Sequence, residues 1–346
     1  MKIGILTFHW ATNYGAILQA YALQTYLKGQ GHDAEIINYR PERNIFLQRL
    51  TWIKNGEWGN FGKENKLETF RKKYLTVSKK KYSSNKDLQN MKDTYDLILC
   101  GSDQVWNFSF IQYAEANKRT YSYYLDFVGG QTKKAAYAAS FGCNKIPFEY
   151  QQDICSQLNT FSHISVREKT AQGMVQELGL KAQVVVDPTL LLDVEKYTVF
   201  CTETEKKQGL FIYKLHNNQT LLTQTEQYLA GTMPFSYADK NTTLETWLQA
   251  IKAAALVLTN SFHGVVFSIL FQTPFISVLV EGSDMNDRIT TLLSSLGLQE
   301  RIVTEYDEKS IERIRNMPID WEDVARKLKV LRGESEDYLS SVINEK

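Results

Sequence analysis

The stretch "AAALVLTNSFHGVVFSILFQTPFISVLV" (253–280) decides the fold class of this 346-residue chain. Its first apolar run is short and aliphatic, which is typical of a buried strand, and "VVFSILF" (265–271) continues as a buried helix. A proline ends that helix, and a second apolar strand follows at 275–280. Strand, helix and strand at this spacing predict a βαβ unit with two parallel strands. The polar segment "TNSFHG" (259–264) therefore lies where the first strand meets the helix.

The same alternation predicts another sheet in the first half of the chain. "KIGILTF" (2–8) is typical of a buried strand, a helical pattern covers 16–31, and a second strand follows at 34–39. In contrast, the segment from Pro41 to about Lys92 is polar and predicts irregular structure. Further strands are expected within "YDLILCGSDQVWN", "KKAAYAASFG", "HISVREKTA", "AQVVVDPTLLL" and "GLFIYKL".

These patterns predict an α/β protein with two Rossmann-like, doubly wound domains that face a cleft. The N-terminal domain is expected at 1–192 and the C-terminal domain at 193–320. Residues 321–346 predict a helix, broken or kinked at Gly333, that packs back on the first domain.

Composition narrows the class of protein. Forty Lys and Arg residues balance 39 Asp and Glu residues, which argues against a nucleic-acid binder. The sequence has no run of about eighteen apolar residues, so we expect no membrane span. The N-terminus lacks the pattern of a signal peptide. The four cysteines have no metal-type spacing and are expected as reduced thiols. We therefore expect a cytoplasmic protein.

Four polar junctions follow predicted strands: 8–16, 100–107, 165–171 and 259–264. The carboxyl ends of parallel strands open into one crevice, so these junctions are candidates for a binding site. Asn, Ser, Thr and Asp also cap helices, and that simpler role stays open for each junction.

His263 is predicted in the first turn of its helix, behind Asn260 and Ser261 as candidate caps. Free N–H groups and the positive end of the helix dipole favour anions there. Gly264 would let a ligand approach the backbone closely. A histidine at this place could bind a phosphate or carboxylate, or transfer a proton. The alternative is a core histidine whose hydrogen bonds are satisfied by a neighbour.

Arg167 lies at a comparable junction in the first half of the chain. Its planar guanidinium suits phosphate or carboxylate. The alternative is a salt bridge to Glu168 or Asp187. If both junctions bind anions, Arg167 and His263 would hold one substrate from opposite domains.

Some other classes of site are disfavoured. The chain has no G-x-G-x-x-G or Walker loop, and no G-x-S-x-G nucleophile elbow. Its histidines lack H-E-x-x-H spacing, so we expect no metal site.

At these junctions the chain resembles the polysaccharide pyruvyltransferase family, in family order over roughly residues 3 to 300. The resemblance implies a GT-B-like fold and transfer of pyruvate from phosphoenolpyruvate to two hydroxyls of a sugar, with release of phosphate. The product would be a cyclic ketal on a capsular or cell-wall saccharide, and no cofactor is implied. The matching segments are "GILTFHWATNYGAILQAYALQTYLKGQGH", "YDLILCGSDQVWN", "AYAASFG", "SVREKTA", "VVVDPTLLL" and "LTNSFHGVVFSILFQTPFI".

The resemblance also implies residue roles. The family's general-acid histidine falls on His263, and its helix-mouth arginine falls on Arg167. Some members have Arg-Leu-His where this chain has Ser261-Phe262-His263, so the basic residue two positions before the histidine is absent. Either Arg167 with backbone N–H groups holds the phosphate, or Arg288 substitutes.

The other candidate site residues are expected to bind the substrates or to act as the base of that reaction. Asn260, Ser261 and Gly264 would contact the anion. Asp103 is expected as the base or as the acceptor of a sugar hydroxyl, with helix or turn capping as its alternative. The other expected substrate contacts are Ser102, Asn13, Tyr14 and Gly15.

The sequence leaves two rival functions open. One is a GT-B glycosyltransferase that uses a nucleotide sugar, and the other is a non-catalytic protein that binds glycans or anions. A further question concerns "RKKYLTVSKKKY" (71–82), which is either a solvated face or a contact with an anionic membrane that carries a lipid-linked acceptor. In the second case Tyr74, Leu75 and Tyr82 would rest at the headgroup level.

Overall fold

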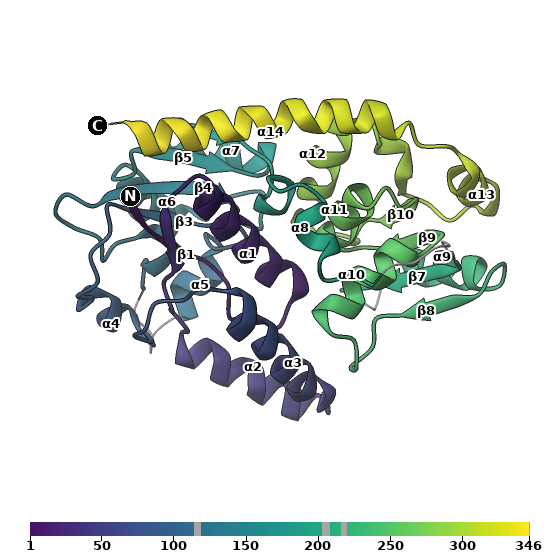
Figure 1. Ribbon diagram of the computed structural model, residues 1–346, viewed down its shortest axis with the longest axis horizontal. Coiled ribbons are helices and arrows are strands. Elements are labelled where there is room, and N and C mark those ends of the chain that lie inside the picture. Colours follow the sequence, from purple (N-terminus) through teal and green to yellow (C-terminus); the bar gives the residue numbers. More distant parts are fainter. Residues whose placement is uncertain (114–118, 203–207, 216–219, 346) are drawn as a thin grey trace. The chain divides into compact units, whose positions relative to one another are not determined.

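The computed structural model describes residues 1–113, 119–202, 208–215 and 220–345. The chain divides into two compact units, Met1–Leu191 with Leu331–Lys346, and Leu192–Val330. Each unit is built on one parallel sheet with flanking helices (Figure 1). The α/β class predicted from the sequence is therefore confirmed.

The first unit has a six-stranded sheet in the order β2-β1-β3-β4-β5-β6, and neighbouring strands are parallel. Every residue of the β3 segment "LILC" is buried, as expected for a central parallel strand covered on both faces. Its strands are β1 (Lys2–Leu6), β2 (Asp33–Ile36), β3 (Leu97–Cys100), β4 (Lys133–Ala139), β5 (His163–Val166) and β6 (Gln183–Val184).

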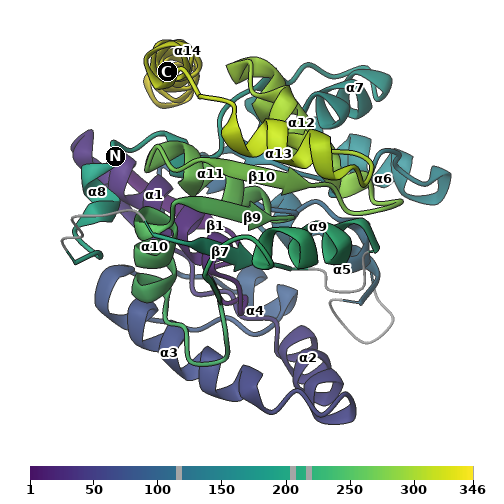
Figure 2. The same ribbon diagram turned by 90° about the vertical axis from the view of Figure 1, so that its right-hand side faces the viewer.

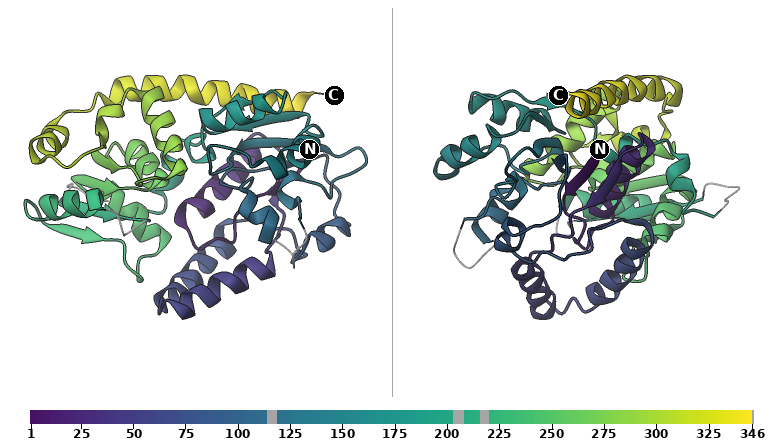
Figure 3. Two further views of the ribbon diagram at one scale, coloured as in Figure 1. Left: turned by 180° about the vertical axis from the view of Figure 1, so that it is seen from behind. Right: turned by 60° about the vertical axis from the view of Figure 1, so that its left-hand side comes forward.

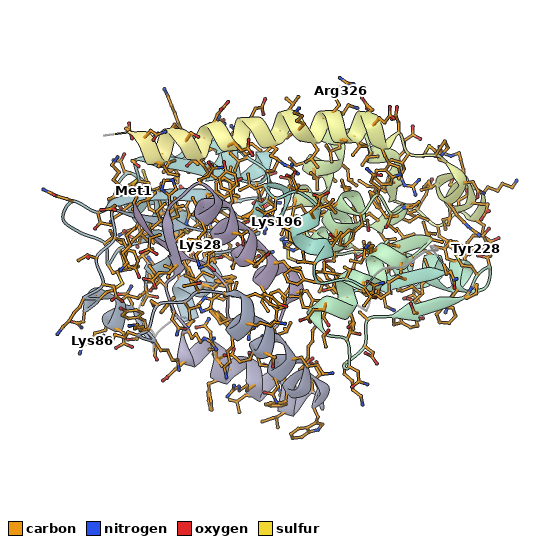
Figure 4. The ribbon with its side chains drawn as sticks, viewed as in Figure 1. Met1, Lys28, Lys86, Lys196, Tyr228 and Arg326 are labelled. Carbon is orange, nitrogen blue, oxygen red and sulfur yellow. The ribbon has the colours of Figure 1, made fainter. Side chains whose placement is uncertain are left out.

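Helices connect these strands. In the last turn of α1, Lys28 (Figure 4) donates a hydrogen bond from Nζ to Thr76 Oγ1 at 2.6 Å, which ties α1 to the segment after α3. The helices are α1 (Tyr14–Gly29), α2 (Glu42–Lys54), α3 (Gly59–Tyr74), α4 (Asn85–Gln89), α5 (Phe108–Tyr113), α6 (Phe148–Leu158) and α7 (Lys169–Glu177), with 3-10 turns η1 (Ser122–Tyr124) and η2 (Pro188–Leu190).

The segment from Pro41 to about Lys92 was expected to be irregular, and that expectation is wrong. It forms α2, α3 and α4, and Figures 1 and 2 show α2 and α3 at one edge of the first unit, away from its strands. The buried residues of α3 are Leu67, Phe70 and Arg71. Because an arginine supplies one of only three buried positions, the apolar period of this helix is too weak to read from the sequence.

The second unit has a five-stranded sheet in the order β11-β10-β9-β7-β8, with parallel neighbours. The βαβ unit predicted at 253–280 is confirmed, because β9 pairs with β10 through α11, whose residues are all buried. Its elements are α8 (Glu195–Thr198), β7 (Leu210–Tyr213), α9 (Thr220–Ala230), β8 (Phe235–Tyr237), α10 (Leu244–Ala253), β9 (Leu256–Thr259), α11 (Phe262–Leu270), β10 (Phe275–Val278), η3 (Asp284–Asn286), α12 (Asp287–Leu296), η4 (Gln299–Arg301), β11 (Ile302–Val303) and α13 (Glu308–Asn316).

The C-terminal helix α14 (Trp321–Asn344) continues through Gly333, so the expected break is wrong (Figure 3). A glycine inside a helix costs only about 1 kcal/mol relative to alanine. Contacts after it offset that cost, since Ser335 Oγ accepts from Val186 N at 3.0 Å and Tyr338 donates to Ala136 O at 2.7 Å. Residues 331–346 thus group with the first unit.

Candidate functional site

Arg167 follows β5 and lies in a buried ion-pair cluster of the first unit. Its side chain is 1% exposed, and Nη1 lies 2.9 Å from Asp187 Oδ2. Nη2 lies 3.3 Å from Asp103 Oδ1, and Nε lies 3.7 Å from Glu168 Oε2. Ser102 Oγ donates to Asp187 at 2.9 Å and accepts from Arg167 at 3.3 Å. The structure therefore brings Arg167, which follows β5, together with Ser102 and Asp103, which both follow β3, so two junctions of one sheet meet here.

The charges of this cluster bear on the role of Arg167. Burial alone would lower the pKa of Arg167, but Asp103, Asp187 and Glu168 raise it above its ordinary value. One guanidinium faces three carboxylates, so both salt bridges named as alternatives, to Glu168 and to Asp187, are present. Binding of a substrate anion by Arg167 stays a prediction.

Asp103 has a backbone conformation that few residues with a side chain adopt. Its φ is +83°, in the left-handed region where Asp and Asn are enriched among non-glycine residues. Its carbonyl accepts from Ser140 N at 3.0 Å, and its Oδ1 accepts from Gln104 N at 2.9 Å and from Arg167. Oδ2 has no hydrogen bond within the described residues, and the side chain is 18% exposed. Asp103 thus presents one carboxylate oxygen at the carboxyl edge of the sheet.

The strand next to Asp103 is irregular at the same edge. The register between β4 and β5 shifts between Ala136 and Ala139, and Ala138 has φ +54°. The hydroxyl of Ser165 supports this bulge, because it accepts from Ala138 N at 3.1 Å and donates to Ala136 O at 3.0 Å. Bulges and residues with left-handed backbone are common near functional sites. The irregular strand therefore favours a functional site at this edge of the sheet.

The junction after β1 shows the capping alternative for Asn13. Its Oδ1 accepts from Gly15 N at 2.8 Å and from Ala16 N at 3.3 Å, at the start of α1. Tyr14 is fully buried, with Lys63 Nζ 4.3 Å from its ring centroid. Contacts of Asn13, Tyr14 and Gly15 with a sugar stay predictions. Because the Tyr14 ring is buried, the structure argues against a contact between this ring and a sugar.

Arg71 holds this junction in place, a role that no pattern in the sequence predicted. The side chain comes from α3 and is 2% exposed. Nε donates to His9 O at 2.7 Å, and Nη2 donates to Trp10 O at 3.0 Å and to Ala11 O at 2.8 Å. Nη1 lies 2.7 Å from Glu64 Oε1, which neutralises the buried charge. One guanidinium thus binds three successive carbonyls of the loop.

His9 lies in the same loop and is completely buried. Burial, followed by the positive charge of Arg40, lowers the pKa of His9 from 6.5 to about 3. The imidazole is therefore neutral at physiological pH, with Nδ1 3.2 Å from Thr7 O.

The predicted membrane cluster at 71–82 needs correction. Arg71, Leu75 and Tyr82 are buried, so they cannot reach a lipid surface. The exposed basic residues of the stretch are Lys72, Lys73, Lys79, Lys80 and Lys81.

In the second unit, the start of α11 is fixed by short local contacts. Ser261 caps the helix, with its Oγ accepting from Gly264 N at 3.3 Å. Thr259 Oγ1 donates to Tyr213 O at 2.7 Å and accepts from Ser261 N at 3.0 Å. A Cβ at Gly264 would lie 2.5 Å from Thr259 Oγ1. Packing against Thr259 thus explains the glycine, whereas contact with a substrate stays a prediction.

Three predicted site residues gather beside this helix start. Asn260 Oδ1 accepts from Leu215 N at 2.8 Å and so joins the ends of β9 and β7. The rings of His263 and Phe262 contact edge to face, with centroids 5.2 Å apart. The guanidinium carbon of Arg288, at the start of α12, lies 5.7 Å from the Phe262 centroid. A histidine and a cation therefore flank one aromatic ring at the N-terminus of a buried helix.

Within the described residues, no three His, Cys, Asp or Glu side chains form a group that could hold a metal ion. Among the helices they form, none combines the length and apolar character needed to cross a membrane.

Several solved structures have a similar fold. A glycosyltransferase from Rickettsia africae ESF-5 has a TM-score of 0.51 at 10% identity, covering 100% of this chain and 99% of that chain. The S. aureus MnaA–UDP co-structure has a TM-score of 0.52 at 10% identity, covering 99% and 97%. UDP-GlcNAc 2-epimerase from Methanocaldococcus jannaschii has a TM-score of 0.50 at 11% identity, covering 97% and 100%. These similarities confirm a GT-B-like fold.

The family follows from the sequence itself. No curated protein matches the chain significantly. Residues 13–282, which include Asp103, Arg167 and His263, match the family described as polysaccharide pyruvyl transferase. The chain is therefore a transferase and belongs to the polysaccharide pyruvyl transferase family.

Proposed function

We propose that this transferase moves the pyruvyl group of phosphoenolpyruvate onto two hydroxyls of one sugar, forming a cyclic ketal and releasing phosphate. The acceptor in this proposal is a surface or capsular polysaccharide, or its lipid-linked precursor. The observation that carries the proposal is His263 in the first turn of α11, within a chain of the pyruvyl transferase family.

The reaction needs only proton transfers and stabilisation of charge, and no cofactor. A proton added to C3 turns the methylene into a methyl group and leaves C2 as an oxocarbenium-like centre. One sugar hydroxyl adds to C2 and loses its proton to the protein. This proton balances the one that the protein gave to C3. The C2–O bond to phosphate then breaks, the second hydroxyl closes the ring, and its proton leaves with phosphate. The protein must supply an acid, a base and donors for the anionic groups.

The second unit offers the acid and the anion donors. His263 is proposed as the acid that protonates C3. The backbone N–H groups at the start of α11 and the helix dipole favour the phosphate or carboxylate of the donor. Arg288 lies against the same Phe262 ring as His263, which supports it as the cation that replaces the basic residue absent at Ser261.

The first unit offers the base. Asp103 is proposed to accept the proton of a sugar hydroxyl through Oδ2, because Oδ1 already binds Arg167 and Gln104 N. Since Arg167 is surrounded by carboxylates, we propose that it orients Asp103 rather than binding the donor. The side chain of Ser102 supports the same cluster, because its hydroxyl donates to Asp187.

The test is turnover with defined acceptors. The protein is incubated with phosphoenolpyruvate and nitrophenyl glycosides or lipid-linked saccharides, and products are analysed by mass spectrometry for the ketal together with released phosphate. His263→Gln serves as the matched inactive variant, since it keeps a polar side chain of similar size. Phosphate release without a ketal, or a ketal formed equally by the variant, would refute the proposal.

A nucleotide sugar is the main competing donor. The protein would then be stabilised against heat by UDP and would transfer a sugar from a UDP-sugar to the same acceptors. Neither effect is expected here. In the proposed setting the enzyme works on the cytoplasmic side of the membrane, where Lys72, Lys73 and Lys79–Lys81 would attract anionic lipids.

A further inference from the structure

Helix α2 exposes a row of large apolar side chains. Phe46 is 60% exposed, Leu50 is 43% exposed and Ile53 is 47% exposed. Residues four and three positions apart lie on one face of a helix, so these three form a continuous stripe. Leu47, 41% exposed, flanks it, and Trp58, 64% exposed, follows the helix. These five residues are called the α2 apolar face below.

The opposite side of α2 is packed normally. Trp52 is 7% exposed, and its ring meets Phe61 of α3 edge to face with centroids 5.3 Å apart. Glu42, in the first turn, lies 3.3 Å from Lys81 Nζ, which ties the start of α2 to the segment after α3. The exposed stripe is therefore a second face of an anchored helix.

The charges around the stripe are mainly basic. Arg49 and Lys54 are exposed on α2 itself. The acidic residues on α2 and directly after it are Glu42, which is paired with Lys81, and Glu57, which keeps its charge while it accepts hydrogen bonds from Asn55 and Asn60. The exposed lysines of 72–81 extend this basic character beyond the helix.

We propose that α2 lies in the surface of an anionic lipid membrane, with the α2 apolar face among the acyl chains and Arg49 and Lys54 at the headgroups. Phe, Leu and Trp on one side with Lys and Arg beside them are typical of helices that bind in the interface plane. A second copy is a poorer occupant, because an isologous contact uses the same patch on both copies and would bring two basic surfaces, each with Arg49 and Lys54, together. The proposal concerns attachment and goes beyond the transfer reaction.

The first experiment measures sedimentation of the full-length protein with vesicles. Vesicles of phosphatidylcholine alone are compared with an equimolar mixture of phosphatidylcholine and phosphatidylglycerol. The variant Phe46→Gln/Leu50→Gln/Ile53→Gln should bind the mixed vesicles roughly tenfold more weakly than wild type, or weaker still. The matched control is Phe148→Gln/Val330→Gln, which removes two apolar side chains exposed elsewhere on helices, by 86% and 59%, and should bind like wild type.

The second experiment locates the contact. Tryptophan fluorescence of the wild type should shift to shorter wavelength on mixed vesicles and be quenched by brominated acyl chains, and Trp58→Phe should lose most of both effects. Lys79→Gln/Lys80→Gln/Lys81→Gln should weaken binding at low salt only. The proposal fails if the wild type stays in the supernatant with mixed vesicles, or if the triple apolar variant binds as well as wild type. It also fails if the lipid-free protein is a dimer that this variant converts to monomer, because the face would then be a self-contact.

Discussion

Replacing Gly264 by alanine tests whether the start of α11 is as tightly fixed as the structure indicates. The new Cβ would lie 2.5 Å from Thr259 Oγ1 and 3.1 Å from both Thr259 Cβ and Cγ2. Thr259 cannot turn away cheaply, because Oγ1 donates to Tyr213 O and accepts from Ser261 N. Either these buried hydrogen bonds break or the helix start moves.

Both routes cost similar amounts. Overpacking a well-packed core costs about 1–3 kcal/mol, and leaving a buried polar group unsatisfied costs about 1–3 kcal/mol. For a domain of this size each kcal/mol lowers the melting temperature by about 2–4 °C, so Gly264→Ala should melt about 2–12 °C below wild type. A displacement of His263 by about 1 Å would also slow turnover, by roughly 10²-fold.

The assay is a thermal melt followed by phosphate release, with Gly173→Ala as the matched control. Gly173 is also helical, in α7, but a Cβ there meets nothing within 4 Å. That variant should gain up to about 1 kcal/mol from helix propensity.

A second-site change identifies the colliding atom. Thr259→Ala combined with Gly264→Ala removes Oγ1 and should be less destabilised than the sum of the two single changes. Thr259→Ser keeps the hydroxyl and should give no such relief. If Gly264→Ala melts and turns over like wild type, or if serine relieves the clash as well as alanine does, the reasoning is wrong.

Four further outcomes are expected. His263→Gln should lower turnover by ~10²–10⁴ without changing the melting temperature, as for loss of a general acid; normal turnover would remove His263 from the mechanism. Arg167→Lys should lower kcat with little change in the KM for phosphoenolpyruvate if it orients Asp103, whereas a raised KM would show that it binds the donor. His9 takes up a proton near pH 6.5 when unfolded but resists it until about 3 when buried, so acidification through that window should destabilise wild type by up to about 1.4 kcal/mol per pH unit more than His9→Asn; equal slopes would refute this. Arg71→Lys should melt below wild type because an ammonium cannot bind three carbonyls in a planar fork, and Lys72→Arg, at an exposed position, should not; equal melting would contradict that role.

The sequence predicts the fold where burial is continuous. The βαβ unit at 253–280 could be predicted because all residues of β9, α11 and β10 are buried, which leaves long apolar runs. The β6 strand was expected within 182–192, yet only Gln183–Val184 is a strand. Asp187 there accepts from Thr189 N and starts a 3-10 turn with Pro188, so a local cap ended the strand early.

The candidate site also combines features that the sequence could predict with features that it could not. Caps span two or three residues, so the capping alternatives for Asn13 and Ser261 could be weighed from the sequence. The cluster of Ser102, Arg167 and Asp187 depends on contacts across 20 to 85 residues, which no local pattern records. The left-handed backbone of Asp103 likewise results from its neighbours in space. A Gly-Ser-Asp turn after a buried strand is the one local signal that pointed there.

The contact between Arg71 and His9 can form only after 62 further residues have been synthesised, because that is their separation along the chain. A ribosome adds ~5–20 residues per second, so the carbonyls of the first loop wait ~3–12 s for the side chain that binds them. During that interval the loop after β1 lacks the side chain that binds it. Chains stalled before residue 71 should accordingly be cut by protease in the 9–12 loop, and chains stalled well beyond α3 should resist. Because the first loop depends on a helix that is made later, this loop is the part of the nascent chain that stays accessible to protease for the longest time.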